Sequence, residues 1–183
     1  PFSLGLVYWL TKKTVLNNIK RMLGFDRLKW AATAAAPISP ELIRWYFALG
    51  IDMYEAYGQT ESSGLATANV PEAFKINSIG KTVPGSQVKL GAQNEILIRG
   101  PNVFLGYLNQ PEKTAETIVD GWLHTGDVGE MDENGFFRIT DRMKDIIITA
   151  GGKNISPSEI ENQLKFSPYI TDAVMIGDER KYL

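Results

Sequence analysis

Cysteine is absent from this chain, and histidine occurs only once among its 183 residues. Without cysteine there are no disulfide bonds and no thiolate-bound metals, and one histidine cannot build a metal site from several imidazoles. Long apolar runs are also missing, because none approaches the roughly 18 residues that a membrane-spanning helix needs. The first residues, from Pro1 to Leu6, lack the Met and the basic region of a signal peptide, so we expect an internal cut in a longer chain.

The chain also has no strong excess of charge. The formal net charge is −2, and lysines and arginines are scattered along the chain, which argues against a nucleic-acid partner. A content of 44% hydrophobic and 22% charged residues is typical of a globular protein and not of a disordered one. The length allows one ordinary hydrophobic core, or one core plus a fragment.

The first part of the chain shows a strand–helix–strand pattern. Residues 1–24 are predicted to be helical, with a glycine as the stop signal. A short buried strand is expected within 28–33, and a serine–proline pair begins a helix over 39–49. Residues 51–57 form the next predicted strand. Because the three elements fit in about 30 residues, they make a βαβ unit, and the two strands should be parallel.

The loops that follow these two strands, residues 34–37 and 58–63, should lie at one edge of the sheet, where open α/β sheets bind ligands. The second loop follows the ring of Tyr57 and carries the hydroxyl of Thr60 and the carboxylate of Glu61. A ring suits a base, a hydroxyl suits a phosphate, and a carboxylate suits Mg²⁺. Taken alone, these residues are explained about as well by a structural turn.

The rest of the chain shows the periodicities and turn signals of short strands and helices. The predicted elements are a hairpin of strands 87–90 and 95–99, a helix at 111–118, a tight turn at 134–135, a buried strand at 146–149, a helix at 157–166 and a strand at 169–176. We interpret the segment from Gly106 to Glu112 as scaffold without a chemical role.

The stretch from Gly121 to Glu161 concentrates charge and glycine between strand-like segments. Asp127 follows a glycine in a turn, and a buried aspartate that caps the turn is one sufficient explanation. A carboxylate can also accept two hydroxyl groups, which is what the 2′,3′-diol of a ribose presents. His124 has no serine or cysteine nucleophile motif beside it, so we interpret it as a structural histidine.

Pieces of this stretch resemble the adenylate-forming superfamily of acyl-CoA synthetases, luciferases and peptide-synthetase adenylation domains. They are Gly121–Asp127, Asp141–Asp145 and Gly151–Glu161, and Tyr57–Glu61 resembles the family's Tyr-Gly-x-Thr-Glu motif. The resemblance implies an α/β fold, namely the C-terminal part of the large adenylate-forming domain and the start of a small α+β C-terminal domain. The expected parts are the end of the nucleotide-binding subdomain with its βαβ unit (1–78), a small β-barrel-like subdomain (79–141), and a hinge with a truncated C-terminal domain (142–183).

The same resemblance implies roles for single residues. Tyr57 would stack on adenine, Thr60 would bond the α-phosphate, and Glu61 would help to hold Mg²⁺. Asp127 would accept ribose hydroxyls, and Arg142 would make a second contact to that sugar. The other implied positions are Lys144 at the hinge, Ala35, Ala36 and Pro37 along the adenine, Gly58, Gln59 and Ile139 near the nucleotide, and Gly151 and Gly152 at the tunnel for the pantetheine arm of CoA.

By this resemblance the parent protein activates a carboxylic acid, most similarly a long-chain fatty acid, with ATP, Mg²⁺ and CoA. Acyl-AMP forms first and acyl-CoA second. The family's phosphate-binding loop would lie before Pro1 and its terminal lysine after Leu183, so we expect this chain alone to be inactive. Two alternatives stay open: adenylation of aryl or amino acids, and a non-catalytic nucleotide-binding relic. The implied location is cytoplasmic, with peripheral membrane association of the parent as a further option, and the oligomeric state is left open.

Overall fold

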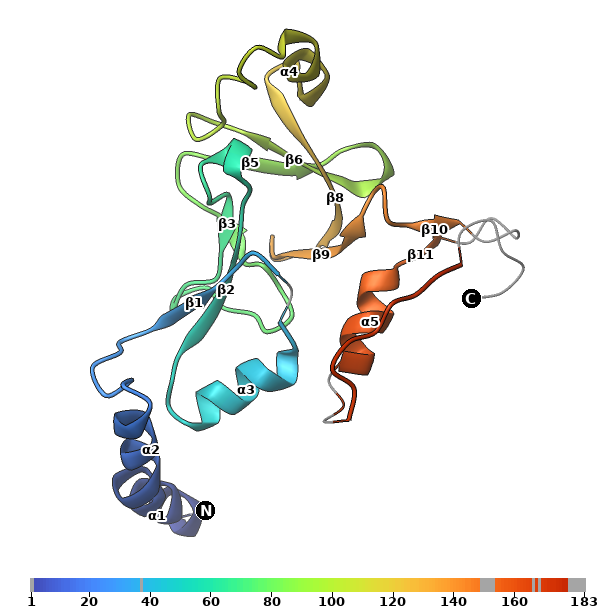
Figure 1. Cartoon of the computed structure of the whole chain (residues 1–183). Coiled ribbons are helices and arrows are strands. Elements are labelled where there is room, and N and C mark those ends of the chain that lie inside the picture. The colour runs from blue at the N-terminus through green and yellow to red at the C-terminus, as the bar shows by residue number, and fades with distance from the viewer. Residues whose placement is uncertain (1, 37, 149–153, 166, 168, 178–183) are drawn as a thin grey trace.

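The polypeptide begins with a helical segment that stands apart from the sheets (Figure 1). The computed structural model describes residues 2–36, 38–148, 154–165, 167 and 169–177. Helix α1 (Phe2–Thr11) continues through a π-helical turn (Lys12–Leu16) into α2 (Asn17–Met22). The helix predicted for residues 1–24 is confirmed over its described part. Most of its apolar side chains are exposed, including Trp9 at 54% and Met22 at 80%.

A four-stranded sheet carries the predicted strand–helix–strand unit, but the prediction that its first strand is buried is wrong, because no residue from 28 to 33 is buried. Strand β1 (Ala31–Thr33) runs parallel to β2 (Met53–Tyr57), and α3 (Pro40–Ala48) connects them. Strands β3 (Thr67–Ala68) and β4 (Lys81–Thr82) extend the sheet in antiparallel pairing, in the order β1-β2-β3-β4. Because β1 and β2 are parallel, their carboxyl ends lie at one edge of the sheet, as predicted.

Helix α3 packs against β2. Its first turn is capped by Ser39, since the backbone N–H of Leu42 donates to Ser39 Oγ at 3.3 Å. Ile43 is fully buried, and the ring of Phe47 meets that of Tyr54 edge to face at 6.1 Å between centroids. The cap and this packing fix the start of the helix directly after the loop that follows β1.

A second sheet of five strands forms the middle of the molecule. Its strands are β5 (Gln87–Leu90), β6 (Glu95–Arg99), β7 (Ile118–Val119), β8 (Trp122–Met131) and β9 (Phe137–Arg142). The order is β5-β6-β8-β7, and β9 pairs with β8 on the remaining part of that long strand. The short connecting elements are a 3₁₀ turn at Ala92–Asn94 and helix α4 (Pro111–Thr117). The hairpin, the helix at 111–118 and the turn at 134–135 are therefore confirmed, with boundaries shifted by a residue.

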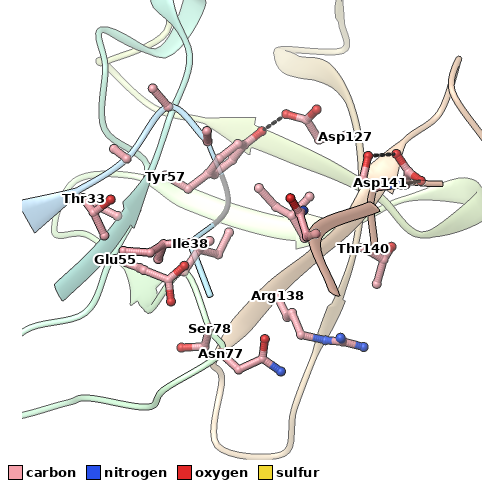
Figure 2. A pocket seen from close by; sticks show the side chains of 18 of the residues that line it. Thr33, Ile38, Glu55, Tyr57, Asn77, Ser78, Asp127, Arg138, Thr140 and Asp141 are labelled. Atoms are coloured by element: carbon pink, nitrogen blue, oxygen red, sulfur yellow. Dashed lines mark hydrogen bonds between the residues drawn. The ribbon is translucent and has the colours of Figure 1, made fainter. Parts of the chain in front are cut away.

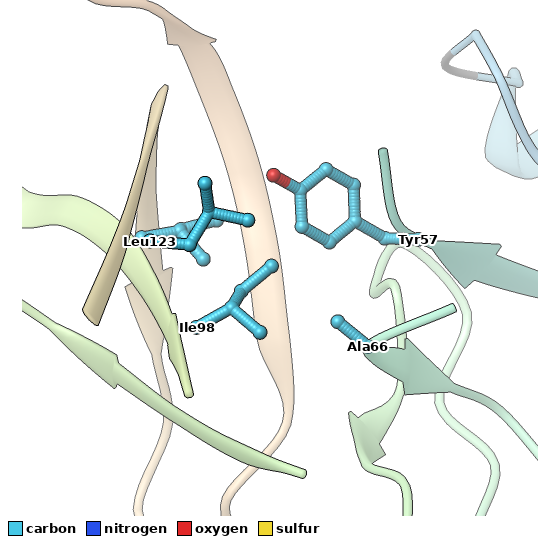
Figure 3. Close-up of a cluster of buried hydrophobic side chains, with 5 residues drawn as sticks. Tyr57, Ala66, Ile98 and Leu123 are labelled. Atoms are coloured by element: carbon cyan, nitrogen blue, oxygen red, sulfur yellow. The ribbon is translucent and has the colours of Figure 1, made fainter. Parts of the chain in front are cut away.

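A buried cluster joins the two sheets (Figure 3). Tyr57 at the end of β2 and Ala66 directly before β3 pack with Ile96, Ile98 and Leu123 from the second sheet. Four of these residues are fully buried, and Tyr57 is 8% exposed. Complete burial of an Ile or Leu side chain contributes about 1.5–3 kcal/mol, so this cluster fixes the end of β2 relative to β8.

The C-terminal part contains a two-stranded ribbon, β10 (Ile147–Ile148) with β11 (Asn154–Ile155), and helix α5 (Pro157–Lys165). The predicted helix is confirmed. The buried strand predicted for 146–149 is wrong in part, because of its described residues 146–148 only Ile147 is buried, and Ile148 is 59% exposed.

The strand predicted for 169–176 is wrong, because residues 169–176 adopt no strand structure. Alternating apolar residues form a strand only when a neighbouring strand supplies backbone partners. Here the Met175 N–H donates instead to the Glu161 side chain at 2.7 Å, and Tyr169 is 94% exposed. Within the described residues, no helix is both long enough and apolar enough to cross a lipid bilayer.

Candidate active site

A cavity of about 750 Å³ lies where the first sheet, the second sheet and helix α5 meet (Figure 2). The loops after β1 and β2 form one wall, as the strand order predicted. Strands β8 and β9 form another wall, and α5 supplies Ser158, Asn162 and Gln163. The sequence-predicted residues that line it are Ala35, Ala36, Tyr57, Gly58, Gln59, Asp127, Ile139 and Arg142.

The carboxylate of Asp127 is the point at which these walls converge. Its Oδ2 accepts hydrogen bonds from the Tyr57 hydroxyl at 2.6 Å and from Gln59 Nε2 at 2.7 Å. Its Oδ1 lies 3.3 Å from Nε of Arg142. Asp127 and Arg142 face each other in the β8–β9 register, which explains their pairing. Tyr57 and Gln59 come from the end of β2, about 70 residues earlier in the chain, so tertiary folding alone assembles the cluster.

The exposure of these groups differs sharply. The Asp127 side chain is 6% exposed, whereas that of Arg142 is 60% exposed. A buried carboxylate needs charged or polar partners, and the three donors supply them. Burial and the neighbouring Asp127 carboxylate both raise the pKa of the Tyr57 hydroxyl, so Tyr57 stays protonated and donates its hydrogen bond.

Glu55 is a cavity residue that the sequence analysis missed. It lies two residues before Tyr57 on β2, and because side chains alternate along a strand, both lie on the same face. Burial raises the pKa of the Glu55 carboxyl to about 7, so neutral and charged forms coexist near neutral pH. The sequence could have indicated Glu55, because it lies two residues before Tyr57 on the same predicted strand.

Asp141 is a second buried carboxylate that the sequence analysis did not single out. It is 3% exposed and accepts hydrogen bonds from the Arg142 N–H at 2.7 Å and from Ser158 Oγ at 3.0 Å. Ser156 Oγ donates to the Thr140 carbonyl at 2.7 Å. These bonds attach the N-terminal end of α5 to β9 and thereby place α5 against the cavity.

Three predicted residues lie outside the cavity lining. Thr60 and Glu61 are in the 3₁₀ turn η2 (Thr60–Ser62), where Thr60 is exposed and Glu61 half-buried. Lys144 is exposed in the turn after β9. Pro37, Gly151 and Gly152 fall outside the described residues. His124 Nδ1 lies 2.8 Å from Glu95 Oε2 on β6, away from the cavity lining.

Few side chains that could bind a metal ion lie near Glu61 among the described residues. In the described ranges no three acidic or imidazole side chains gather as a metal cluster. Glu61 offers one carboxylate, whose Oε1 accepts the Tyr107 hydroxyl at 2.8 Å. A lone carboxylate fits Mg²⁺, which proteins commonly bind through one or two carboxylates together with substrate phosphates and waters.

The chain belongs to the AMP-binding enzyme family. The family model for the AMP-binding enzyme matches residues 7–108, and that for the AMP-binding enzyme C-terminal domain matches residues 144–183. The fold accordingly is the C-terminal part of a large adenylate-forming domain followed by the start of the small one. The chain is 44% identical over 183 residues to the long-chain-fatty-acid–CoA ligase ACSBG2 of Xenopus laevis, covering 96% of this chain and 25% of that protein.

Solved structures give the same assignment. O-succinylbenzoate CoA synthetase (MenE) of Bacillus subtilis, in complex with its acyl-adenylate intermediate, superposes with a TM-score of 0.78 at 30% identity, covering 84% of this chain and 34% of that one. The same enzyme in complex with ATP and magnesium gives a TM-score of 0.75 at 30% identity, with 83% and 34% covered. The chain thus spans about a quarter to a third of the length of the proteins it matches.

Proposed function

We propose that this chain is the nucleoside-binding part of an ATP-dependent acid–CoA ligase that acts on a long-chain fatty acid. The carboxylate of the acid would attack the α-phosphate of ATP to form acyl-AMP and release pyrophosphate, and the thiol of CoA would then attack the acyl carbonyl to form acyl-CoA and release AMP. The observation that carries the proposal is the convergence of Tyr57, Gln59 and Arg142 on Asp127 beside the cavity. The name of the Xenopus relative supports the fatty acid, and the MenE complexes support the nucleotide.

The base is assigned to the wall made by Tyr57 and the alanine loop. The small side chains of Ala35 and Ala36 leave room for a planar ring, and the Tyr57 ring offers a stacking face. Glu55 lies on the same strand face and is assigned to the polar edge of the base. A carboxyl whose pKa is about 7 accepts a hydrogen bond when charged and can donate one when neutral.

The ribose is assigned to Asp127 and Arg142. A carboxylate has about four lone-pair positions, and three donors approach Asp127 in this structure. Ribose hydroxyls would use the remaining position and replace the exposed guanidinium or the Gln59 amide. A hydrogen bond to a charged group contributes about 1.5–3 kcal/mol, so Asp127 is expected to dominate the affinity for the nucleoside.

Mg²⁺ is assigned to Glu61, and the α-phosphate to Thr60, on the exposed side of the η2 turn. When bound, the metal would neutralise charge on the phosphates while the carboxylate of the acid attacks the α-phosphate and pyrophosphate leaves. The contribution of this chain is to hold the Glu61 carboxylate at a fixed position. Lys144 is assigned to the hinge between the half-reactions, and Gly151 and Gly152 to the CoA tunnel.

The test is ATP–pyrophosphate exchange by the full-length protein with a panel of acids. Exchange that depends on long-chain fatty acids, followed by thioester formation with CoA, would establish the proposal. Exchange with only aryl or amino acids would favour another adenylate-forming ligase, as in the MenE and anthranilate CoA ligase neighbours. No exchange with any acid would favour the nucleotide-binding relic. The cytoplasmic location and the membrane association stay outside this test and remain predictions.

A further inference from the structure

The loop between β6 and α4 folds back over the turn that carries Glu61. The Phe104 N–H donates to the Glu61 carbonyl at 2.8 Å, and the Tyr107 hydroxyl donates to Glu61 Oε1 at the same distance. The backbone and the side chain of Glu61 are therefore both held by one loop, more than 40 residues further along the chain. Oε2 of Glu61 accepts no hydrogen bond from the residues that the structure describes.

The same loop is attached to the η2 turn at a second place. Asn102 Nδ2 donates to the carbonyls of Ser62 at 3.3 Å and Leu65 at 3.1 Å, and Ser63 Oγ donates to the Asn102 carbonyl at 2.8 Å. On the turn side, all of these bonds involve residues that directly follow Glu61. The register between loop and turn is therefore set independently of the Tyr107 hydroxyl.

Tyr107 is also held in place by contacts other than its hydrogen bond to Glu61. Its backbone N–H donates to Thr114 Oγ1 at 2.9 Å, and its ring meets that of Phe104 edge to face at 4.9 Å between centroids. Lys113 Nζ lies 4.5 Å from the centroid of the Tyr107 ring. Ordering the side chain in advance lowers the entropy that is lost when the hydroxyl holds a carboxylate in one orientation.

We propose that Tyr107 is a positioning residue that orients the Glu61 carboxylate so that Oε2 is presented to the metal ion of the ATP complex. The inference rests on the proposed function, because it takes Glu61 as the metal-binding carboxylate. The Tyr107 hydroxyl donates its hydrogen bond to Oε1 of Glu61, so Oε2 is the oxygen that would bind the metal ion. Hydrogen-bond partners of metal ligands commonly change metal affinity by about 10- to 100-fold when they are removed.

The experiment uses Mn²⁺ as a paramagnetic substitute for Mg²⁺. The full-length protein with ATP is titrated with Mn²⁺, and electron paramagnetic resonance gives the dissociation constant of the metal. Tyr107→Phe removes the hydroxyl and keeps the ring. The expected result is Mn²⁺ binding about 10- to 100-fold weaker, with the dissociation constant for metal-free AMP within about twofold of the wild type. Tyr46→Phe is the matched control, because Tyr46 is also half-buried and lies on α3, and it should change neither constant.

Glu61→Gln separates a failure of this inference from a failure of the proposed function. If Glu61→Gln loses Mn²⁺ and Tyr107→Phe does not, the role of Tyr107 is overturned and the metal role of Glu61 stands. If Glu61→Gln binds Mn²⁺ like the wild type, both assignments are overturned. Equal losses of Mn²⁺ and AMP binding in Tyr107→Phe would indicate a structural role and would also overturn the inference.

A second variant keeps the test decisive if Tyr107→Phe does not fold. Thr114→Val removes the oxygen that accepts the Tyr107 N–H, and leaves the tyrosine hydroxyl in place. It should weaken Mn²⁺ binding by a smaller factor than Tyr107→Phe and leave AMP binding unchanged. Unaltered Mn²⁺ affinity in this variant would contradict the proposed positioning.

Discussion

The nucleoside side and the phosphate side of the proposed site differ in how completely this chain builds them. On the nucleoside side, a carboxylate that is 6% exposed is held by donors from the β2 loop and from β9. On the phosphate side, Thr60 is exposed, and Glu61 keeps one oxygen without a hydrogen bond from the described residues. The residues proposed to bind the nucleoside are therefore already held together within this chain, whereas those proposed for the phosphate and the metal are more exposed and have fewer contacts.

The largest expected effect comes from breaking the nucleoside side at its centre. Asp127→Ala removes the group on which Tyr57, Gln59 and Arg142 converge, and AMP binding should weaken by about 10- to 150-fold, because a charged hydrogen bond contributes about 1.5–3 kcal/mol. Isothermal titration of the full-length protein with AMP measures this. Glu133→Ala, an exposed acidic residue in the turn between β8 and β9, is the charge-matched control and should bind AMP normally. An unchanged affinity in Asp127→Ala would remove the ribose assignment.

The second-largest effect is expected at the proposed hinge, and it tests whether Lys144 matters more for thioester formation than for adenylation. Lys144→Pro should reduce thioester formation about tenfold more than adenylation, because proline restricts the backbone rotation assigned to this hinge. The two rates are measured separately, as transfer of a preformed acyl-adenylate to CoA and as pyrophosphate exchange. Lys144→Ala should leave the ratio unchanged. Equal losses in both steps would contradict the hinge assignment.

A smaller effect is expected from trimming one donor of the nucleoside side. Tyr57→Phe keeps the stacking ring and removes the hydrogen bond to Asp127, so AMP binding should weaken by about 2- to 13-fold, corresponding to about 0.5–1.5 kcal/mol. Titration with AMP gives the value, and Tyr46→Phe again serves as control. A loss as large as that of Asp127→Ala would mean that the tyrosine hydroxyl, and not the carboxylate, dominates the site.

The smallest effect concerns the pH dependence of stability on the base side. The pKa of Glu55 is about 7 in the folded protein and is raised from 4.5 by burial, so the folded state holds the proton more tightly than the unfolded state. The contribution of Glu55 to stability is therefore greatest below about pH 4.5 and falls as the pH rises through 7.

Glu55→Gln should remove this dependence and raise the melting temperature of the full-length protein by about 2 °C at pH 8 relative to the wild type. The difference should be smaller at pH 5.5. Differential scanning calorimetry at the two pH values measures it, with Glu72→Gln, an exposed glutamate, as control. Equal melting temperatures of the wild type and Glu55→Gln at pH 8 would show that the Glu55 carboxyl is not buried in the folded state.

Local signals predicted the elements well where neighbours in sequence decide the structure. The serine–proline start of α3, the parallel pairing of β1 with β2 and the hairpin of β5 with β6 all follow from short-range patterns. The strand expected at 169–176 failed because a strand depends on a partner, which no local pattern reveals.

The site was predictable where a motif identified it and hidden where only tertiary contacts reveal it. Tyr57, Asp127 and Arg142 were singled out by the family motifs, and the structure brings them together. Glu55 and Asp141 were missed, because their importance depends on burial, which a charged residue in the sequence does not indicate. The Tyr107–Glu61 contact was missed because it joins two segments by long-range folding.

We propose that Tyr57, Gln59, Asp127 and Arg142 together hold one adenosine monophosphate. A crystal structure of the full-length protein grown with AMP tests it most directly. In the expected structure the base lies against the ring of Tyr57, and the ribose hydroxyls lie within hydrogen-bond distance of Asp127. AMP bound elsewhere, with the Asp127 carboxylate still occupied only by its protein donors, would contradict it.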